Sequence, residues 1–146
     1  MRRAIFLSIF VLVASGCGSS EFDMAPVSGV VTLDGEPVPG ARVIFSPQRT
    51  GQDALSAGPA SDGQTNEDGR YTLASSMDSK PGAVVGPHTV TISTYLAESD
   101  RSRDTHTVIR KEEIPQRYNE PGALSFEVPA KGTEAADFEL ESRRRK

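Results

Sequence analysis

Apolar and polar residues alternate along much of the chain after residue 27, and turn residues interrupt the alternation about every eight to twelve positions. A period of two places successive side chains on opposite faces of a β-strand. The pattern predicts strands over residues 27–33, 41–46, 70–73, 88–96, 124–128 and 137–141. We therefore expect an all-β domain, a single antiparallel β-sandwich of about seven strands.

The phase of each predicted strand separates a candidate core from the surface. The inward residues are Val31, Leu33, Val43, Phe45, Tyr71, Leu73, Val90, Ile92, Leu124, Phe126, Val128, Phe138 and Leu140. Asp34-Gly35 predicts a hairpin turn between the strands at 27–33 and 41–46, because glycine adopts positive φ at no steric cost. A short helical turn or packed loop is expected at 114–118.

Two long polar stretches interrupt this pattern, at residues 48–61 and 97–113. We expect both to be loops. Sandwiches present their binding residues on loops, so these stretches are the predicted positions of any specific contact.

The N-terminus has a pattern of its own. A basic start is followed by an apolar run over residues 4–14, which has the size of a signal-peptide core and is shorter than the roughly 20 residues that a membrane span needs. The run ends in small residues, Ala14-Ser15-Gly16, directly before Cys17. The alternatives are an ordinary secretory signal with a coincidental cysteine, or a retained anchor.

Residues 14–17 resemble the lipobox of bacterial lipoproteins, with Ala14 where leucine is usual. The resemblance implies cleavage between Gly16 and Cys17, and diacylglycerol on the Cys17 sulfur. Gly18, in place of aspartate, resembles lipoproteins that are sent to an outer membrane. The predicted location is therefore the cell envelope, lipid-anchored at the outer membrane or cell surface.

Length and charge narrow the possible classes of protein. The 146 residues allow one domain. The formal net charge of -4 argues against a nucleic-acid partner, and a single cysteine excludes an internal disulfide. The predicted organisation is a signal peptide at 1–16, a lipidated tether at 17–26, a domain at 27–141 and a basic tail at 142–146. We expect the tail to be solvated, with contact to anionic lipid or polymer as the alternative.

Few residues offer catalytic or metal-binding chemistry. His88 lies on the inward phase of a strand and is expected to be structural, whereas His106 lies in a charged stretch and is expected to be solvated. Residues 64–69 resemble part of a calcium loop, but Gln64 and Ser75 occupy positions that need carboxylates, which favours a tight turn. We predict no catalytic residue, no metal and no cofactor.

Three segments together resemble the carboxypeptidase regulatory-like (transthyretin-like, prealbumin-like) β-sandwich family. They are VSGVVTLDGEPVPGARVIF at 27–45, TNEDGRYTL at 65–73 and GAVVGPHTVTI at 82–92, followed later by IPQRY at 114–118. The residues that match the family's turns and strand starts are Gly35, Pro37, Gly40, Gly69 and Tyr71.

The resemblance implies a non-catalytic module. One enzyme branch of the fold, the 5-hydroxyisourate hydrolases, ends in Tyr-Arg-Gly-Ser, whereas this chain ends in ESRRRK. The sequence thus predicts an exported envelope protein, held at the membrane by lipid on Cys17, that contacts an unknown envelope protein or glycan. The alternative is a small-ligand or carbohydrate-binding module, and the remote alternative is a transthyretin-like hydrolase.

Overall fold

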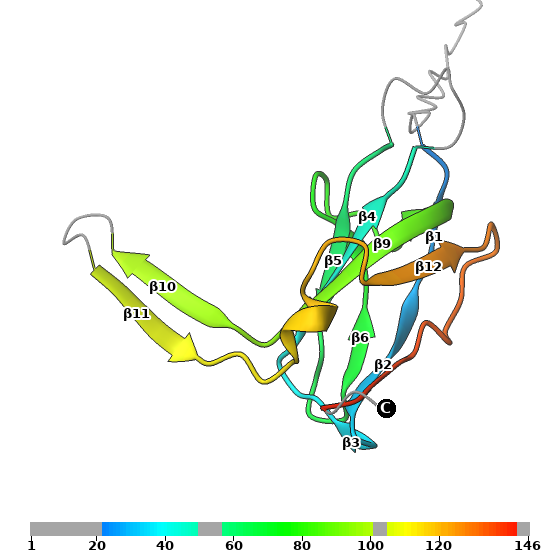
Figure 1. Ribbon diagram of the computed structural model, residues 1–146. Coiled ribbons are helices and arrows are strands. Elements are labelled where there is room, and N and C mark those ends of the chain that lie inside the picture. The colour runs from blue at the N-terminus through cyan, green and yellow to red at the C-terminus, as the bar shows by residue number, and fades with distance from the viewer. Residues whose placement is uncertain (1–21, 50–56, 101–104, 143–146) are drawn as a thin grey trace, which may run out of the picture.

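Two β-sheets form the body of the protein in the computed structural model, which describes residues 22–49, 57–100 and 105–142 (Figure 1). The larger sheet has the strand order β12 (Leu124–Val128), β9 (Gly86–Ser93), β4 (Arg42–Pro47), β5 (Ser61–Gln64) and β7 (Ala74–Ser75). The smaller sheet has the order β13 (Phe138–Leu140), β2 (Ser28–Leu33) and β3 (Glu36–Pro37), and β6 (Arg70–Thr72) also pairs with β2. The predicted all-β sandwich is confirmed.

Smaller elements extend this body. β1 (Met24–Ala25) pairs with β8 (Ala83–Val84). β10 (Leu96–Asp100) and β11 (Thr105–Arg110) form a hairpin that projects from the sandwich, here called the arm (Figure 1). The 3-10 turn η1 (Gln116–Tyr118) follows the arm, which confirms the helical turn expected at 114–118. Among the described residues, no helix has the length and apolar character to span a bilayer.

The core lies between the sheets and is centred on Phe45 of β4. The Phe45 ring lies 5.7 Å from that of Phe126 and 6.1 Å from that of Phe138, both in edge-on geometry. Such pairs contribute beyond the area they bury. The predicted inward residues are confirmed as buried, except that Leu33, Leu124 and Phe126 are half-buried against the core.

The strand predicted at 88–96 is shorter than expected. β9 ends at Ser93, and the backbone N–H of Thr94 donates to the Glu112 carboxylate (2.9 Å) instead of continuing the ladder. β9 therefore ends at the point where the Glu112 side chain, and not a neighbouring strand, accepts the backbone hydrogen bond.

The opening hairpin also differs from the prediction. Asp34 and Gly35 have φ of 52° and 89°, the two positive values that a type I′ turn requires. However, β2 pairs only with the two residues of β3, and β4 belongs to the other sheet. Pro37 and Pro39 lack the N–H that a longer ladder needs, so the chain leaves the small sheet and crosses to the large one.

The sandwich is not purely antiparallel, contrary to the prediction. β13 runs parallel to β2, with Phe138 opposite Val31 and Leu140 opposite Leu33. The reason is a crossover, because the preceding strand β12 lies in the larger sheet and the chain changes sheets after Val128. A crossover allows a strand to enter beside β2 in the same direction, which a hairpin does not.

The two predicted loops differ in outcome, because the described residues of 48–60 form no strand, whereas 97–113 contains two. β5 begins at Ser61, and Gly63 pairs with Val43 of β4. The stretch 97–113 was expected to be a loop, and this is wrong, because it forms most of the arm, with Ala97 opposite Val108. Residues 50–56 and 101–104 lie outside the described residues.

The sandwich also starts earlier than predicted. Ala25, which was assigned to the tether, is buried in the core. The backbone carbonyl of Asp23 accepts from the N–H of Val85 (2.9 Å), and that of Pro26 accepts from Thr133 (2.9 Å). The chain is therefore held in the fold from Asp23 onward.

Candidate functional site

Of the residues that the sequence singles out, the structure brings Pro37 and Gly69 together, because a Cβ at Gly69 would lie 3.2 Å from the Cβ of Pro37. Gly16 and Cys17 lie outside the described residues, as do residues 143–146 of the basic tail. Gly35 and Pro37 lie at the β2–β3 turn, Gly40 follows it, and Gly69 lies in the turn before β6. That last turn is closed by the side chain of Asn66, whose Oδ1 accepts from two backbone N–H groups.

Tyr71 serves the packing of the smaller sheet. Its hydroxyl donates to the backbone carbonyl of Ala136 (2.6 Å), and burial, followed by the charge of Asp137, raises the pKa of Tyr71 above its usual range. Gly29 lies opposite Tyr71 in the β2–β6 ladder, and a Cβ there would lie 2.0 Å from the same carbonyl oxygen. Gly29 and Tyr71 together thus allow the crossover segment to lie close against β2.

His88 does not lie in an open site. His88 is buried against Phe45 with ring centroids 5.6 Å apart, and its Nδ1 lies 2.9 Å from the carbonyl oxygen of Gly86. Burial lowers the pKa of His88, which favours the neutral ring. His106 lies in β11, but its side chain is outside the described part of the structure.

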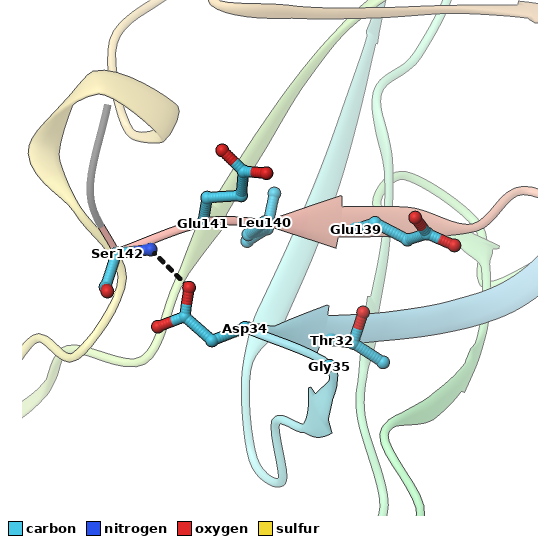
Figure 2. A pocket seen from close by; sticks show the side chains of 7 residues that line it. All are labelled: Thr32, Asp34, Gly35, Glu139, Leu140, Glu141 and Ser142. Atoms are coloured by element: carbon cyan, nitrogen blue, oxygen red, sulfur yellow. Dashed lines mark hydrogen bonds between the residues drawn. The ribbon is translucent and has the colours of Figure 1, made fainter. Parts of the chain in front are cut away.

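An open groove of about 900 Å³ lies at the end of the smaller sheet where the parallel strands β2 and β13 finish (Figure 2). Its lining consists of Thr32, Asp34, Gly35, Glu139, Leu140, Glu141 and Ser142. Asp34 Oδ1 accepts from the N–H of Ser142 (3.0 Å), and the Asp34 N–H donates to the carbonyl of Leu140 (2.8 Å). These contacts fasten β13 to the hairpin turn, and the lining lacks the aromatic surface that stacks on sugar rings.

No cluster of histidine, cysteine and carboxylate side chains with the geometry of a metal site occurs within the described ranges. The three carboxylates along the groove therefore do not form a metal centre.

The arm is the feature that sequence reasoning missed. Its strands pair with each other and with no other strand among the described residues. Four large apolar side chains at or beside it are about half exposed: Tyr95 (55%), Leu96 (49%), Val108 (50%) and Ile109 (53%). An isolated two-stranded hairpin is marginally stable in water, so its orientation depends on how its base is fixed.

Glu112 fixes one side of that base. Its Oε1 accepts from the N–H and hydroxyl of Thr94 (2.9 and 2.8 Å) and from the N–H of Ile114 (2.9 Å). Its Oε2 accepts from the hydroxyl of Ser93 (2.5 Å) and the amide of Asn119 (3.0 Å). Burial alone would raise the pKa of Glu112, but these hydrogen bonds outweigh it and lower the pKa to about 2.

Arg110 fixes the other side. Its Nη1 donates to the carbonyl of Pro39 (3.0 Å), and a Cβ at Gly40 would lie 1.9 Å from the same nitrogen. Gly40 therefore makes room for the guanidinium, in addition to its positive φ of 67°. The turn at Gly40, which the sequence indicates through the conformational freedom of glycine, thus also helps to hold the base of the arm.

One feature of the sequence indicates that the base of the arm contains a polar contact. Thr94 continues the inward phase of β9 and is buried. A buried hydroxyl needs a hydrogen-bonding partner, and Glu112 supplies it. Nothing in the sequence indicates which of the many carboxylates that partner is.

Comparisons with known proteins add little. No family model matches the chain, and no curated protein matches it. Among solved structures, the chain is similar to a 9R-lipoxygenase from Cyanothece PCC8801, with 8% identity and a TM-score of 0.38, covering 82% of this chain and 16% of that one. The chain thus spans a small part of that enzyme, and a likeness this distant carries no argument about activity.

Proposed function

We propose that the protein is an exported, lipid-anchored envelope protein whose β-sandwich is a non-catalytic interaction module that binds a protein partner through the arm. The anchor is the predicted lipid on Cys17, and the resemblance to carboxypeptidase regulatory-like domains favours a module of this kind. The observation that carries the proposal is the arm, whose apolar side chains are exposed although the base is tightly held.

The arm's composition favours a protein over a glycan as the partner. Val108 and Ile109 offer aliphatic surface, and Tyr95 is the one aromatic side chain beside it. Because β10 and β11 pair only with each other among the described residues, each has a second edge that faces away from the hairpin. Backbone groups along an open strand edge bind an added strand of another protein, and neighbouring side chains select it.

Site-specific photo-crosslinking in native membranes tests this role. A photoreactive residue at Val108 or Ile109 is expected to give a discrete crosslinked species, because the arm faces the partner. The matched control is Glu127, which is exposed on β12 of the sandwich body. Equal crosslinking at the arm and at Glu127, or none at either arm position, would remove the basis for the arm as the binding surface.

A further inference from the structure

We propose that the end of the sandwich where the described chain begins rests on the bilayer surface, with Phe22, Met24, Pro59 and Met77 as its contact residues. This inference rests on the proposed lipid anchor at Cys17. It adds an orientation to the anchor, because it states which face of the domain meets the lipid. We call these four residues the lipid face.

The four residues of the lipid face line a small pocket of about 140 Å³ together with Ser75, Asp78 and Lys80. Met77 is 79% exposed, the largest exposure among the large hydrophobic residues that the structure describes. Phe22 packs against the neighbouring segment closely enough that a Cβ at Gly58 would lie 3.1 Å from its ring. Apolar side chains from three separate parts of the chain thus meet at one end of the sandwich.

The short distance along the chain to Cys17 restricts where this end can lie. Four residues, 18–21, separate Cys17 from Phe22. Five residue steps span at most about 18 Å even when fully extended. An acyl chain on the Cys17 sulfur must enter the hydrocarbon, so Phe22 cannot lie far from the headgroups.

Because the start of the described chain is fixed in the fold, its short distance from Cys17 also determines how the sandwich is oriented on the bilayer. From Asp23 onward the chain is fixed by β1 and by the hydrogen bond from Val85 to the Asp23 carbonyl. Figure 1 shows this start of the described chain at the end of the sandwich opposite β3. When the start is held near the bilayer, the lipid face turns toward it and the β2–β3 turn points away.

The charges around the lipid face favour apolar insertion over attraction to anionic lipid. Lys80 lies 2.9 Å from the carboxylate of Asp78, and both are exposed. Hydrogen bonds from Lys80 and Ser75 lower the pKa of Asp78 to about 2, so its carboxyl group is ionised at physiological pH. The exposed carboxyl side chain of Asp23, between Phe22 and Met24, leaves this end without an excess of basic side chains. We therefore expect contact with phosphatidylcholine that changes little with salt, unlike attraction to an anionic surface.

The single cysteine of the sequence makes a direct test possible. The lipid occupies Cys17, so one introduced cysteine is the unique labelling site. The lipidated full chain carries Met77→Cys or, as the matched control, Glu36→Cys in β3 at the opposite end. A fluorophore on each is measured in phosphatidylcholine vesicles that contain nitroxide-labelled headgroups.

We expect several-fold stronger quenching at position 77 than at position 36, and the same ratio at high salt. Equal quenching at both positions in a protein whose intact mass includes the acyl chains would overturn the lipid face and leave the anchor intact. A protein without acyl mass would instead refute the anchor. An emission change of the label at position 77 that rises with protein concentration in Cys17→Ala protein without vesicles would show that a second copy covers this end, and would overturn the proposal.

Discussion

Replacing the carboxylate of Glu112 is the most informative test of how the base of the arm is held. This carboxylate accepts five hydrogen bonds, from Ser93, Thr94, Ile114 and Asn119. In Glu112→Gln, the amide oxygen can keep the three donors at one position, but the NH₂ group then faces the Ser93 hydroxyl and the Asn119 amide. The shape of the side chain is nearly unchanged, so the substitution tests the charge and its acceptors.

The size of the effect follows from the pKa. A shift in the pKa from the ordinary 4.5 to about 2 corresponds to about 3.5 kcal/mol, at about 1.4 kcal/mol for each pKa unit. Because Glu112 remains partly open to solvent, screening reduces this value, and we expect a loss of about 1–2 kcal/mol in the free energy of unfolding at pH 7. The matched control is Glu113→Gln, whose side chain is adjacent and exposed.

The pH dependence gives a sharper test. The pKa of Glu112 is lower in the folded protein than in the unfolded chain, so its stabilising contribution is complete above about pH 4.5 and disappears as the pH falls toward 2. The difference in unfolding free energy between wild type and Glu112→Gln should therefore shrink over that range. Urea unfolding measures it. Equal losses for Glu112→Gln and Glu113→Gln, or a difference that does not change with pH, would refute the reasoning.

Three further substitutions test the packing of the sandwich. Gly29→Ala places a Cβ 2.0 Å from the Ala136 carbonyl and should cost about 1–3 kcal/mol in urea unfolding, whereas an unchanged midpoint would contradict the close approach. Tyr71→Phe leaves the same carbonyl without its donor and should cost about 1–2 kcal/mol, and a stability equal to wild type would show that the hydroxyl bond is dispensable. Burial lowers the pKa of His88, so the unfolded chain takes up the proton first and the melting temperature should fall as the pH drops below about 6.5. His88→Phe should flatten that slope, and a slope that persists would assign it to another group.

The sequence predicts the strands whose apolar residues alternate, because burial on one face of a sheet leaves a period of two. Phe45, Val90 and Phe138 are examples, and all three are in the core. β5 leaves no such pattern. Gly63 of that strand faces the backbone of Thr72, where a Cβ would lie 2.3 Å from the carbonyl oxygen, so the strand is held by its neighbours and not by apolar side chains.

The arm escaped prediction for a related reason. Neither face of a projecting hairpin is buried against a sheet. Its polar and apolar residues therefore do not show the alternation that burial of one face produces. The contacts that hold its base join distant parts of the chain, such as Arg110 and the Pro39 carbonyl 71 positions apart. Only the assembled fold brings such groups together. By contrast, the Asp34-Gly35 turn is local, and its dipeptide alone indicated it.

The intact mass of the protein from the native membrane fraction is the measurement that decides whether lipid on Cys17 holds the protein at a membrane. We expect a chain that begins at Cys17 and carries acyl mass, and a Cys17→Ala variant that is not cleaved there or is lost from the membrane. An unmodified product with a different N-terminus, recovered in soluble form from both versions, would show that Cys17 carries no lipid anchor.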